Sequence, residues 1–380
     1  IKDHSWSLFV NGVNVTFSLF CSEYGNDYAI SSSCWGSPAF TWIWWIIVIS
    51  TYGRLGTVAV SAGAQTPSGY MVNILFAAVA ERWDQYQEPL RKELDLIGLE
   101  YQLSEKLPPS EVDYIIYAPN SSIQDFSDFT NLKAVLNLWA GVEDVVKNET
   151  LKVPLARMVD EGLTRGMKEW VLGQVMRHHL GLDLHIFGQD GQWRDWSAPP
   201  LASDRNVTVL GLGALGAECA KELANVGFKV RGWSSTKKSL RNVTCHYGSE
   251  GLAKSLFESE IVVLLLPSTA DTENIINTKT ISYLAKGAVI INPGRGTLID
   301  ETALLKSLDA GKLGHATLDV FRQEPLPTDH LFWEHPKITV TPHIASETRP
   351  PAASQVIATN IDRFEKGKPL LYQVNFRTGY

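Results

Sequence analysis

The sequence has few cysteines and no excess of positive charge. Four of its 380 residues are cysteine, and no CxxC pair or other zinc-binding spacing occurs among Cys21, Cys34, Cys219 and Cys245. A net charge of −7 argues against the basic face that general nucleic-acid binding requires. We therefore expect a reduced, cytoplasmic globular protein that binds neither nucleic acid nor membrane.

The first seventy residues lack charge and methionine. They contain only five Asp, Glu, Lys or Arg residues, and the first methionine of the chain is Met71. Their apolar run, residues 39–49, is shorter than the roughly twenty residues of a membrane-spanning helix. No basic segment closely precedes it, as one would in a signal peptide. We expect residues 1–70 to be an extension outside the fold; a membrane or targeting role is the alternative.

From Met71 onward, apolar strand-like runs alternate with amphipathic segments. The first half contains the runs VNILFAAV, VDYIIYAP, LKAVLNLW and VPLARMV. The second half contains VTVLGLG, FKVRGW, IVVLLLP, AVIINPG, HATLDVF and ITVTPH. This alternation is typical of βαβ units and parallel sheets. It predicts an α/β protein with two Rossmann-like halves of about six strands each and a cleft between them. Residues 166–183 are predicted to form a long helix, and residues 187–206 a connector.

A glycine motif opens the second half. Gly211, Gly213 and Gly216 have the spacing G-x-G-x-x-G, with Ala214 and Leu215 inside it, and they lie between a predicted strand and a predicted helix. The first glycine permits a tight turn, the second lets a pyrophosphate approach the backbone, and the third lets helix and strand pack closely. The N-terminus of the helix then offers N–H groups to phosphates. The motif predicts a dinucleotide site; a glycine-rich turn in an unrelated α/β sheet is the alternative.

An acid is missing at the end of the next strand. An Asp or Glu usually binds the adenosine ribose of NAD there, but this chain reads SSTKK at residues 234–238. A carboxylate would repel a 2′-phosphate, whereas hydroxyl and ammonium groups can bind it. Ser234, Thr236, Lys237 and Lys238 therefore favour NADPH, with NADH still possible, and Arg231 should point elsewhere. The alternative is that the lysines belong to a solvated loop.

Three side chains near the ends of later strands could perform chemistry. They are Arg295 in NPGRGTLID, Glu324 in LDVFRQEPLP and His343 in TPHIAS. Ligands of open α/β sheets bind beyond the carboxyl ends of the strands. Arginine suits the carboxylate of a 2-oxo acid, and histidine is the usual proton donor near neutral pH. A carboxylate bonded to the imidazole would favour its protonated form. Taken singly, each could also be a structural turn residue.

These motifs, in this order, resemble those of the D-isomer-specific 2-hydroxyacid dehydrogenases. The resemblance covers Met71 to Tyr380. Within the family, LWAGVEDV, GWSSTKK and the tail from SETRPPAAS onward are similar to members that reduce glyoxylate and hydroxypyruvate. The resemblance implies an NADPH-preferring reductase that makes glycolate and D-glycerate. A D-lactate-type dehydrogenase and a dinucleotide-sensing, corepressor-like protein remain alternatives.

The resemblance also implies roles for individual residues. Arg295 would bind substrate, His343 would act as acid/base, and Glu324 would be the partner of His343. The backbone N–H groups of Ala140, Gly141 and Val142 would bind the substrate carboxylate. The implied cofactor-binding residues are Gly211, Gly213, Ala214, Leu215, Gly216, Ser234, Thr236, Lys237, Lys238, Pro267, Pro293 and Asp319. Tyr117 and Trp139 are candidates for the substrate pocket and Arg349 for a second cationic contact, with ordinary packing or surface roles as alternatives. We expect no metal, because Arg295 supplies the cation.

The family's domain order places the cofactor domain inside the substrate domain. Residues 71–168 and 346–380 would form the substrate-binding domain, and residues 169–345 the dinucleotide-binding Rossmann domain. Helix 166–183 would join two chains into a homodimer; its apolar face could instead belong to the internal core.

Overall fold

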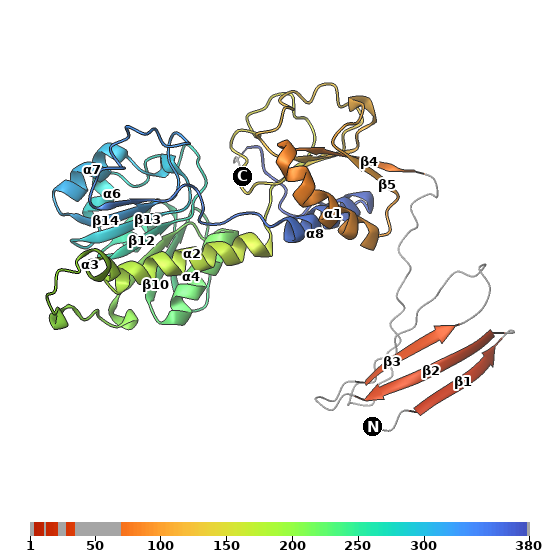
Figure 1. Ribbon diagram of the computed structural model, residues 1–380, viewed down its shortest axis with the longest axis horizontal. Helices are drawn as coiled ribbons and strands as arrows, with labels where there is room; N and C mark the ends of the chain where they lie inside the picture. The colour runs from red at the N-terminus through yellow and green to blue at the C-terminus, as the bar shows by residue number, and fades with distance from the viewer. Residues whose placement is uncertain (1–3, 11–12, 22–27, 35–69, 378–380) are drawn as a thin grey trace. The chain divides into compact units, whose positions relative to one another are not determined.

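A computed structural model describes residues 4–10, 13–21, 28–34 and 70–377 (Figure 1). The chain divides into two compact units, residues 1–70 and 71–380. In the first unit, β1 (His4–Val10), β2 (Val13–Cys21) and β3 (Tyr28–Cys34) form an antiparallel sheet in that order. The apolar run 39–49 lies outside the described residues, so the role of the first seventy residues stays a prediction.

The second unit contains a five-stranded sheet in which every strand pairs in parallel. Its order is β5-β4-β6-β7-β8. The strands are β4 (Val72–Ala77), β5 (Tyr101–Ser104), β6 (Tyr114–Tyr117), β7 (Ala134–Asn137) and β8 (Leu155–Ala156). The apolar runs predicted four of these five strands. β5 was missed because its sequence, YQLS, is short and half polar, as suits an edge strand.

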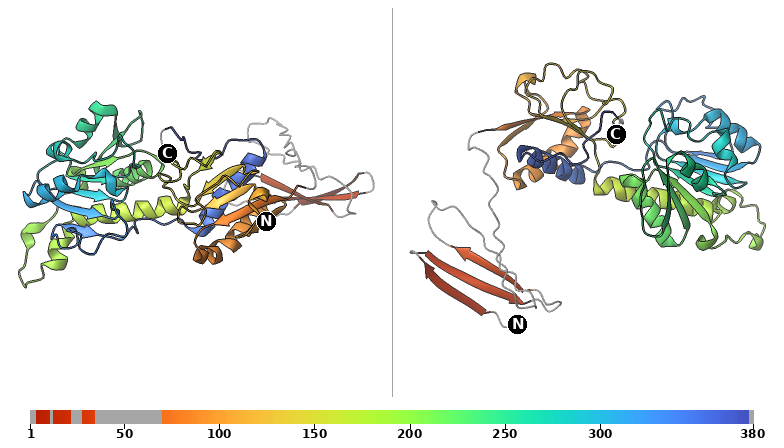
Figure 2. Two further views of the ribbon diagram at one scale, coloured as in Figure 1. Left: turned by 90° about the horizontal axis from the view of Figure 1, so that it is seen from above. Right: turned by 180° about the vertical axis from the view of Figure 1, so that it is seen from behind.

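Two helices distant in sequence cover one face of this sheet together. α1 (Ala80–Leu96) and α8 (Pro350–Glu365) share one hydrophobic core, in which Leu90 of α1 and Ile361 of α8 are fully buried. The two helices lie side by side in the views of Figure 2. The C-terminal segment therefore packs on the sheet that begins at Val72.

A second parallel sheet has seven strands, one more than expected. Its order is β11-β10-β9-β12-β13-β14-β15. The strands are β9 (Asn206–Leu210), β10 (Lys229–Ser234), β11 (Val243–Tyr247), β12 (Ile261–Leu264), β13 (Ala288–Asn292), β14 (Leu313–Leu318) and β15 (Ile338–Val340). β11 was missed because this edge strand, VTCHY, mixes polar and apolar residues. The order reverses between β9 and β12, the switch point at which ligands of such sheets bind.

Helices lie on both faces of the seven-stranded sheet, with α2 and α4 on one side and α6 and α7 on the other (Figure 1). The remaining helices are α2 (Glu161–His179), α3 (Leu182–Phe187), α4 (Ala214–Val226), α5 (Gly248–Leu256), α6 (Thr278–Ser282) and α7 (Glu301–Asp309). Short 3₁₀ turns occupy Pro109–Glu111, Asp195–Ser197, Ala202–Asp204 and Gly296–Leu298. The two parallel sheets confirm the predicted α/β class. Within the described residues, every helix is too short or too polar to cross a membrane.

The long helix differs from its predicted bounds of 166–183. It begins at Glu161 because the Asp160 carboxylate accepts the N–H of Leu163 at 2.9 Å and caps the first turn. It ends at His179, and Gly181 follows with φ 62°, a conformation that favours glycine. Val171 and Val175 are buried in the core shared with α4. The apolar face of this helix therefore belongs to the internal core.

Candidate active site

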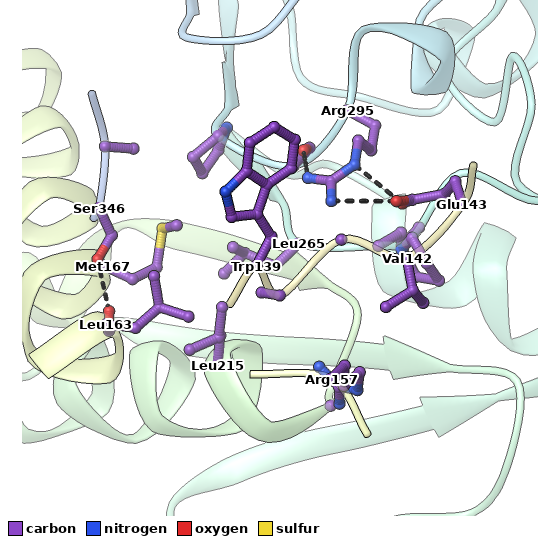
Figure 3. A pocket seen from close by; sticks show the side chains of 18 of the residues that line it. Trp139, Val142, Glu143, Arg157, Leu163, Met167, Leu215, Leu265, Arg295 and Ser346 are labelled. Carbon is purple, nitrogen blue, oxygen red and sulfur yellow. Dashed lines mark hydrogen bonds and ion pairs between the residues drawn. The ribbon is translucent and has the colours of Figure 1, made fainter. Parts of the chain in front are cut away.

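A cavity of about 760 Å³ lies among loops that follow strands of both parallel sheets. This volume is in the range of small-molecule and cofactor sites. Figure 3 shows a close view of its lining. The predicted site residues that line it are Trp139, Ala140, Gly141, Val142, Gly211, Gly213, Ala214, Leu215, Gly216, Ser234, Thr236, Lys238, Pro267, Pro293, Arg295, Asp319, Glu324 and His343. The structure thus gathers both groups of candidates, cofactor-binding and catalytic, around one cavity.

The glycine loop has the geometry that its spacing predicts. Gly211 follows β9 with φ 104°, and a Cβ there would lie 2.3 Å from the Leu265 carbonyl oxygen. A Cβ on Gly216 would lie 1.8 Å from the Gly211 carbonyl oxygen, so helix α4 can approach the loop only without a side chain. Gly213 is the N-cap of α4, and a Cβ there would meet no atom within 4 Å. The open space at Gly213, beside the first N–H groups of α4, is where a phosphate group fits.

The end of β10 carries hydroxyl groups at the position where NAD-binding proteins usually have an Asp or Glu. Ser234 is buried, and its hydroxyl donates to the Thr236 carbonyl oxygen at 2.6 Å. Thr236 and Lys238 line the cavity beside it. Arg231 donates to the carbonyl oxygen of Phe257, in agreement with the expectation that it points elsewhere. The strand end therefore offers hydroxyl groups and the Lys238 ammonium group to a ligand.

Arg295 lies against the loop that follows β7. Its Nε donates to Glu143 Oε1 at 2.9 Å, and its Nη1 donates to the Gly294 carbonyl oxygen at 2.6 Å. A Cβ on Gly141 would lie only 2.1 Å from Arg295 Nη2, so the guanidinium group occupies the space that a side chain at position 141 would need. The backbone of residues 140–142 and the guanidinium group therefore approach each other at one end of the cavity.

A buried asparagine at the end of β7 binds the backbone of the loop that contains residues 139–142. Asn137 ends β7 and is 1% exposed. Its amide nitrogen donates to the carbonyl oxygens of Trp139 at 2.8 Å and Gly141 at 2.9 Å. Two bonds from this buried side chain tie the backbone of residues 139 and 141 to the end of β7, and the Trp139 carbonyl oxygen also accepts the N–H of Met158. This residue was not among the sequence candidates.

His343 and Glu324 form a hydrogen-bonded pair. His343 Nδ1 lies 2.7 Å from Glu324 Oε2, and Glu324 Oε1 accepts the N–H of Phe321 at 2.9 Å. The hydrogen bond to Glu324 raises the pKa of His343 above its ordinary value, against the opposing effect of burial. Burial by itself would raise the pKa of Glu324, but the bonds from His343 and Phe321 outweigh it and lower that pKa. The pair therefore favours a protonated imidazole beside an ionised carboxylate, with Nε2 left for another partner.

Asp319 organises the turn that carries His343. This carboxylate is fully buried and accepts from Thr341 Oγ1 at 2.6 Å and from the N–H groups of Ile344 and Ala345, both at 2.9 Å. His343 itself has φ 54°, which is uncommon for a residue with a side chain. Two backbone bonds from its N–H, to the carbonyl oxygens of Asp319 and Thr341, hold it there.

Three of the described sequence candidates do not line the cavity. Lys237 is exposed at its edge. Tyr117 is buried, where its hydroxyl donates to the Ile123 carbonyl oxygen and its ring packs on Phe126. Arg349 precedes α8, and its side chain lies over Gly162 of α2. Sequence spacing placed them near the right strand ends, but packing decides which way each side chain points.

Comparisons with known proteins agree with this geometry. Residues 171–345 match the model of the D-isomer specific 2-hydroxyacid dehydrogenase, NAD binding domain. A "Glyoxylate/hydroxypyruvate reductase A" of Serratia proteamaculans is 36% identical over 298 residues, which are 73% of this chain and 94% of that protein.

Solved structures give the same result. A D-isomer specific 2-hydroxyacid dehydrogenase from Xanthobacter autotrophicus, in complex with NADPH and MES, has a TM-score of 0.77 and 37% identity. It is covered completely by 82% of this chain. The NADPH-dependent glyoxylate/hydroxypyruvate reductase of Sinorhizobium meliloti, in complex with NADP and sulfate, has a TM-score of 0.71 and 34% identity. It is covered completely by 81% of this chain. The resemblance noted in the sequence is confirmed: the chain is an NAD(P)-dependent oxidoreductase and belongs to the D-isomer specific 2-hydroxyacid dehydrogenase family.

Proposed function

We propose that this protein is an NADPH-preferring reductase that converts glyoxylate to glycolate and hydroxypyruvate to D-glycerate. The observation that carries the proposal is one cavity lined by the His343–Glu324 pair, by Arg295 and by a β10 end without an acid. Relatives at 34–36% identity that are named as glyoxylate/hydroxypyruvate reductases support it.

The residues present fit a dinucleotide with a 2′-phosphate. The open space at Gly213 and the N–H groups at the start of α4 would hold the pyrophosphate. Ser234, Thr236 and Lys238 would hold the 2′-phosphate. Asp319 would lie toward the nicotinamide carboxamide, with Pro267 on the adenosine side and Pro293 also along the cofactor. When bound, the reduced nicotinamide supplies the hydride that the reaction needs.

The chain's own groups bind the substrate and supply the proton. Arg295 would bind the 2-oxo acid with its planar guanidinium group and polarise the carbonyl group. N–H groups of Ala140, Gly141 and Val142 would hold the carboxylate. As C2 gains hydride, the carbonyl oxygen gains negative charge and needs a proton. His343 Nε2 would donate this proton, because Nδ1 is bonded to Glu324. The negative charge of Glu324 stabilises the protonated imidazole before the transfer, and the hydrogen bond keeps the ring in place.

The domain assignment remains a proposal. Residues 71–168 and 346–380 would form the substrate-binding domain, since α8 packs on the sheet that begins at β4. Residues 169–345 would form the dinucleotide-binding domain, and the family model for the NAD binding domain matches residues 171–345.

We also propose that the protein is a homodimer, through a surface that differs from the one expected. The apolar face of α2 is used inside the chain. The segment after it, residues 182–201, exposes large apolar side chains instead. They are Leu182, Leu184, Ile186, Phe187, Trp193, Trp196 and Leu201. Phe187, Trp193 and Trp196 are each at least 74% exposed, and a cluster of this kind marks a protein-interaction surface.

The test of the enzymatic proposal compares initial rates of glyoxylate and hydroxypyruvate reduction with NADPH and with NADH. We expect turnover that is faster with NADPH. His343→Ala should lose at least about a hundredfold in kcat while NADPH still binds, because the proton donor is gone. His246→Ala, on the edge strand β11, is the control and should behave as wild type. If wild type reduced neither oxo acid, the proposed function would be wrong; if His343→Ala kept most of its kcat, the acid role would be wrong.

A further inference from the structure

The guanidinium group of Arg295 has a carboxylate partner that sequence motifs did not reveal. Glu143, in the loop after β7, faces Arg295, in the loop after β13 (Figure 3). Glu143 Oε1 accepts from Nε at 2.9 Å, and Glu143 Oε2 accepts from Nη2 at 3.4 Å. The two side chains are 21% and 31% exposed, so solvent screens this pair less than a surface pair.

Glu143 is ionised in this arrangement. Burial by itself would raise its pKa, but the charge of Arg295 and hydrogen bonds from Arg295 and from the backbone of Ser268 outweigh burial and lower it. The carboxylate of Glu143 is therefore held by Arg295, in the loop after β13 of the seven-stranded sheet.

The hydrogen bonds of Arg295 use three of its N–H groups. A guanidinium group has five N–H donors. Glu143 takes the side edge formed by Nε and Nη2, and the Gly294 carbonyl oxygen takes one N–H of Nη1 at 2.6 Å. One N–H on each of Nη1 and Nη2, the two nitrogens of the terminal edge, has no partner among the described residues and remains for a ligand. Nη2 stands over the backbone of Gly141, so this edge lies beside the loop that would bind the substrate carboxylate.

We propose that Glu143 is a positioning residue: it holds the side edge of Arg295 so that the terminal edge presents two parallel N–H donors to the 2-oxo acid. The inference rests on the proposed function, because it assigns the partner of the substrate-binding arginine. Without this carboxylate the long arginine side chain can rotate, and its side edge competes with its terminal edge for the substrate. A displacement of a substrate-positioning group by about 1 Å is enough to change the reaction rate strongly.

The first experiment replaces the carboxylate with its amide. Glu143→Gln keeps the size of the side chain, but its NH₂ group cannot accept from either guanidinium nitrogen. We expect kcat/KM for glyoxylate to fall by about tenfold or more, and the inhibition constant of oxamate, an isostere of a 2-oxo acid, to rise by a similar factor. The Kd of NADPH should stay within about twofold. Glu143→Asp should recover part of the loss, and Glu149→Gln, an exposed site on the same segment, should match wild type.

The second experiment separates positioning of Arg295 from a structural role of the loop. Arg295→Lys replaces the fork with a single ammonium group that has no edges to orient. In that background Glu143→Gln should change oxamate binding by less than about twofold, because the two residues act as one unit. If the two effects multiplied in the double variant, Glu143 would act independently of Arg295 and the inference would be wrong.

Failure of the inference is distinguishable from failure of the proposed function. An active wild type with unchanged kcat/KM in Glu143→Gln would overturn the inference alone. A gain in kcat/KM would overturn it too, because Glu143 would then compete with the substrate for Arg295. A wild type that reduced neither glyoxylate nor hydroxypyruvate would overturn the proposed function, and the inference with it.

Discussion

The charge of Glu324 should set the pH range in which the protein reduces its substrate. Reduction consumes a proton from His343, so the rate falls as pH rises through the pKa of that imidazole. Glu324 raises this pKa through a 2.7 Å hydrogen bond, which keeps the acid protonated to a higher pH. Glu324→Gln removes the charge while it leaves the size of the side chain unchanged. The falling limb of the pH–rate profile should therefore move to lower pH.

The size of this effect follows from the contacts of Glu324. A hydrogen bond to a charged partner is worth about 1 kcal/mol more than a neutral one. We use no more than this value because the side chains of His343 and Glu324 are 53% and 35% exposed, and solvent screens their attraction. About 1 kcal/mol changes the ratio of protonated to neutral His343 roughly fivefold.

A second contact makes that figure a lower bound. Glu324 accepts from both Phe321 N–H and the imidazole, whereas a glutamine has only one acceptor oxygen. If the amide oxygen stays with Phe321, the NH₂ group faces Nδ1 and favours the neutral ring. Either orientation of the amide therefore disfavours the imidazolium form.

The assay is kcat/KM for glyoxylate with NADPH from about pH 5 to about pH 9, a range that spans the ordinary pKa of histidine. The variant should approach wild type at the acid end and be at least about fivefold slower above neutral pH. Glu334→Gln, an exposed glutamate on the segment between β14 and β15, makes the same charge change and should leave the profile in place. A uniform loss at every pH would show that Glu324 orients His343 without tuning its pKa, and would refute the reasoning.

Two further predictions concern the cofactor and the assembly. Ser234→Asp places a carboxylate at the end of β10, where it repels a 2′-phosphate; the ratio of kcat/KM for NADPH to that for NADH should fall more than about tenfold, or about 1.4 kcal/mol. Ser282→Asp, at an exposed end of α6, is its control, and an unchanged ratio at position 234 would mean that the phosphate is bound elsewhere. The full chain should have the mass of two copies in analytical ultracentrifugation, and Trp193→Ser with Trp196→Ser should shift it toward one copy, because they remove two exposed indoles of the 182–201 surface. A wild type that sediments as one copy at micromolar concentration would exclude the homodimer.

Sequence patterns located the buried central strands and the glycine loop, because in each the residues are selected by a single physical requirement. Central strands such as β6 and β12 are buried on both faces, so their sequences are unbroken apolar runs that predict a strand. The glycine loop is visible because Gly211 and Gly216 leave no room for a side chain, while Gly213 keeps open the space at the start of α4. Edge strands β5 and β11 carry mixed sequences because one side faces solvent, and neither produced a signal that could be separated from a loop.

Side-chain direction was harder to predict than strand position. Lys237 and Lys238 are neighbours in sequence, yet of the two only Lys238 lines the cavity. Tyr117 ends a strand beside the site, but its ring turns into the aromatic packing with Phe126. Arg349 lies near the right loop in sequence and packs its aliphatic stem over Gly162. Each outcome depends on contacts with residues distant in sequence, so the local spacing could not determine it.

Glu324 and Glu143, two of the carboxylates that line the cavity, show why the partners of catalytic side chains can escape sequence motifs. Glu324 is 19 residues from His343 and lies in a recognisable segment, whereas Glu143 is 152 residues from Arg295 and meets it only because two sheets bring their loops together. With His343 protonated, the Arg295–Glu143 pair and the His343–Glu324 pair each sum to zero formal charge. Because each pair is balanced, it attracts an anionic substrate less through net charge than through N–H donors that already point at the substrate. In a cavity of this kind, residues that aim the donors matter as much as those that carry the charge, which is why Glu143 and Asn137 belong to the functional site.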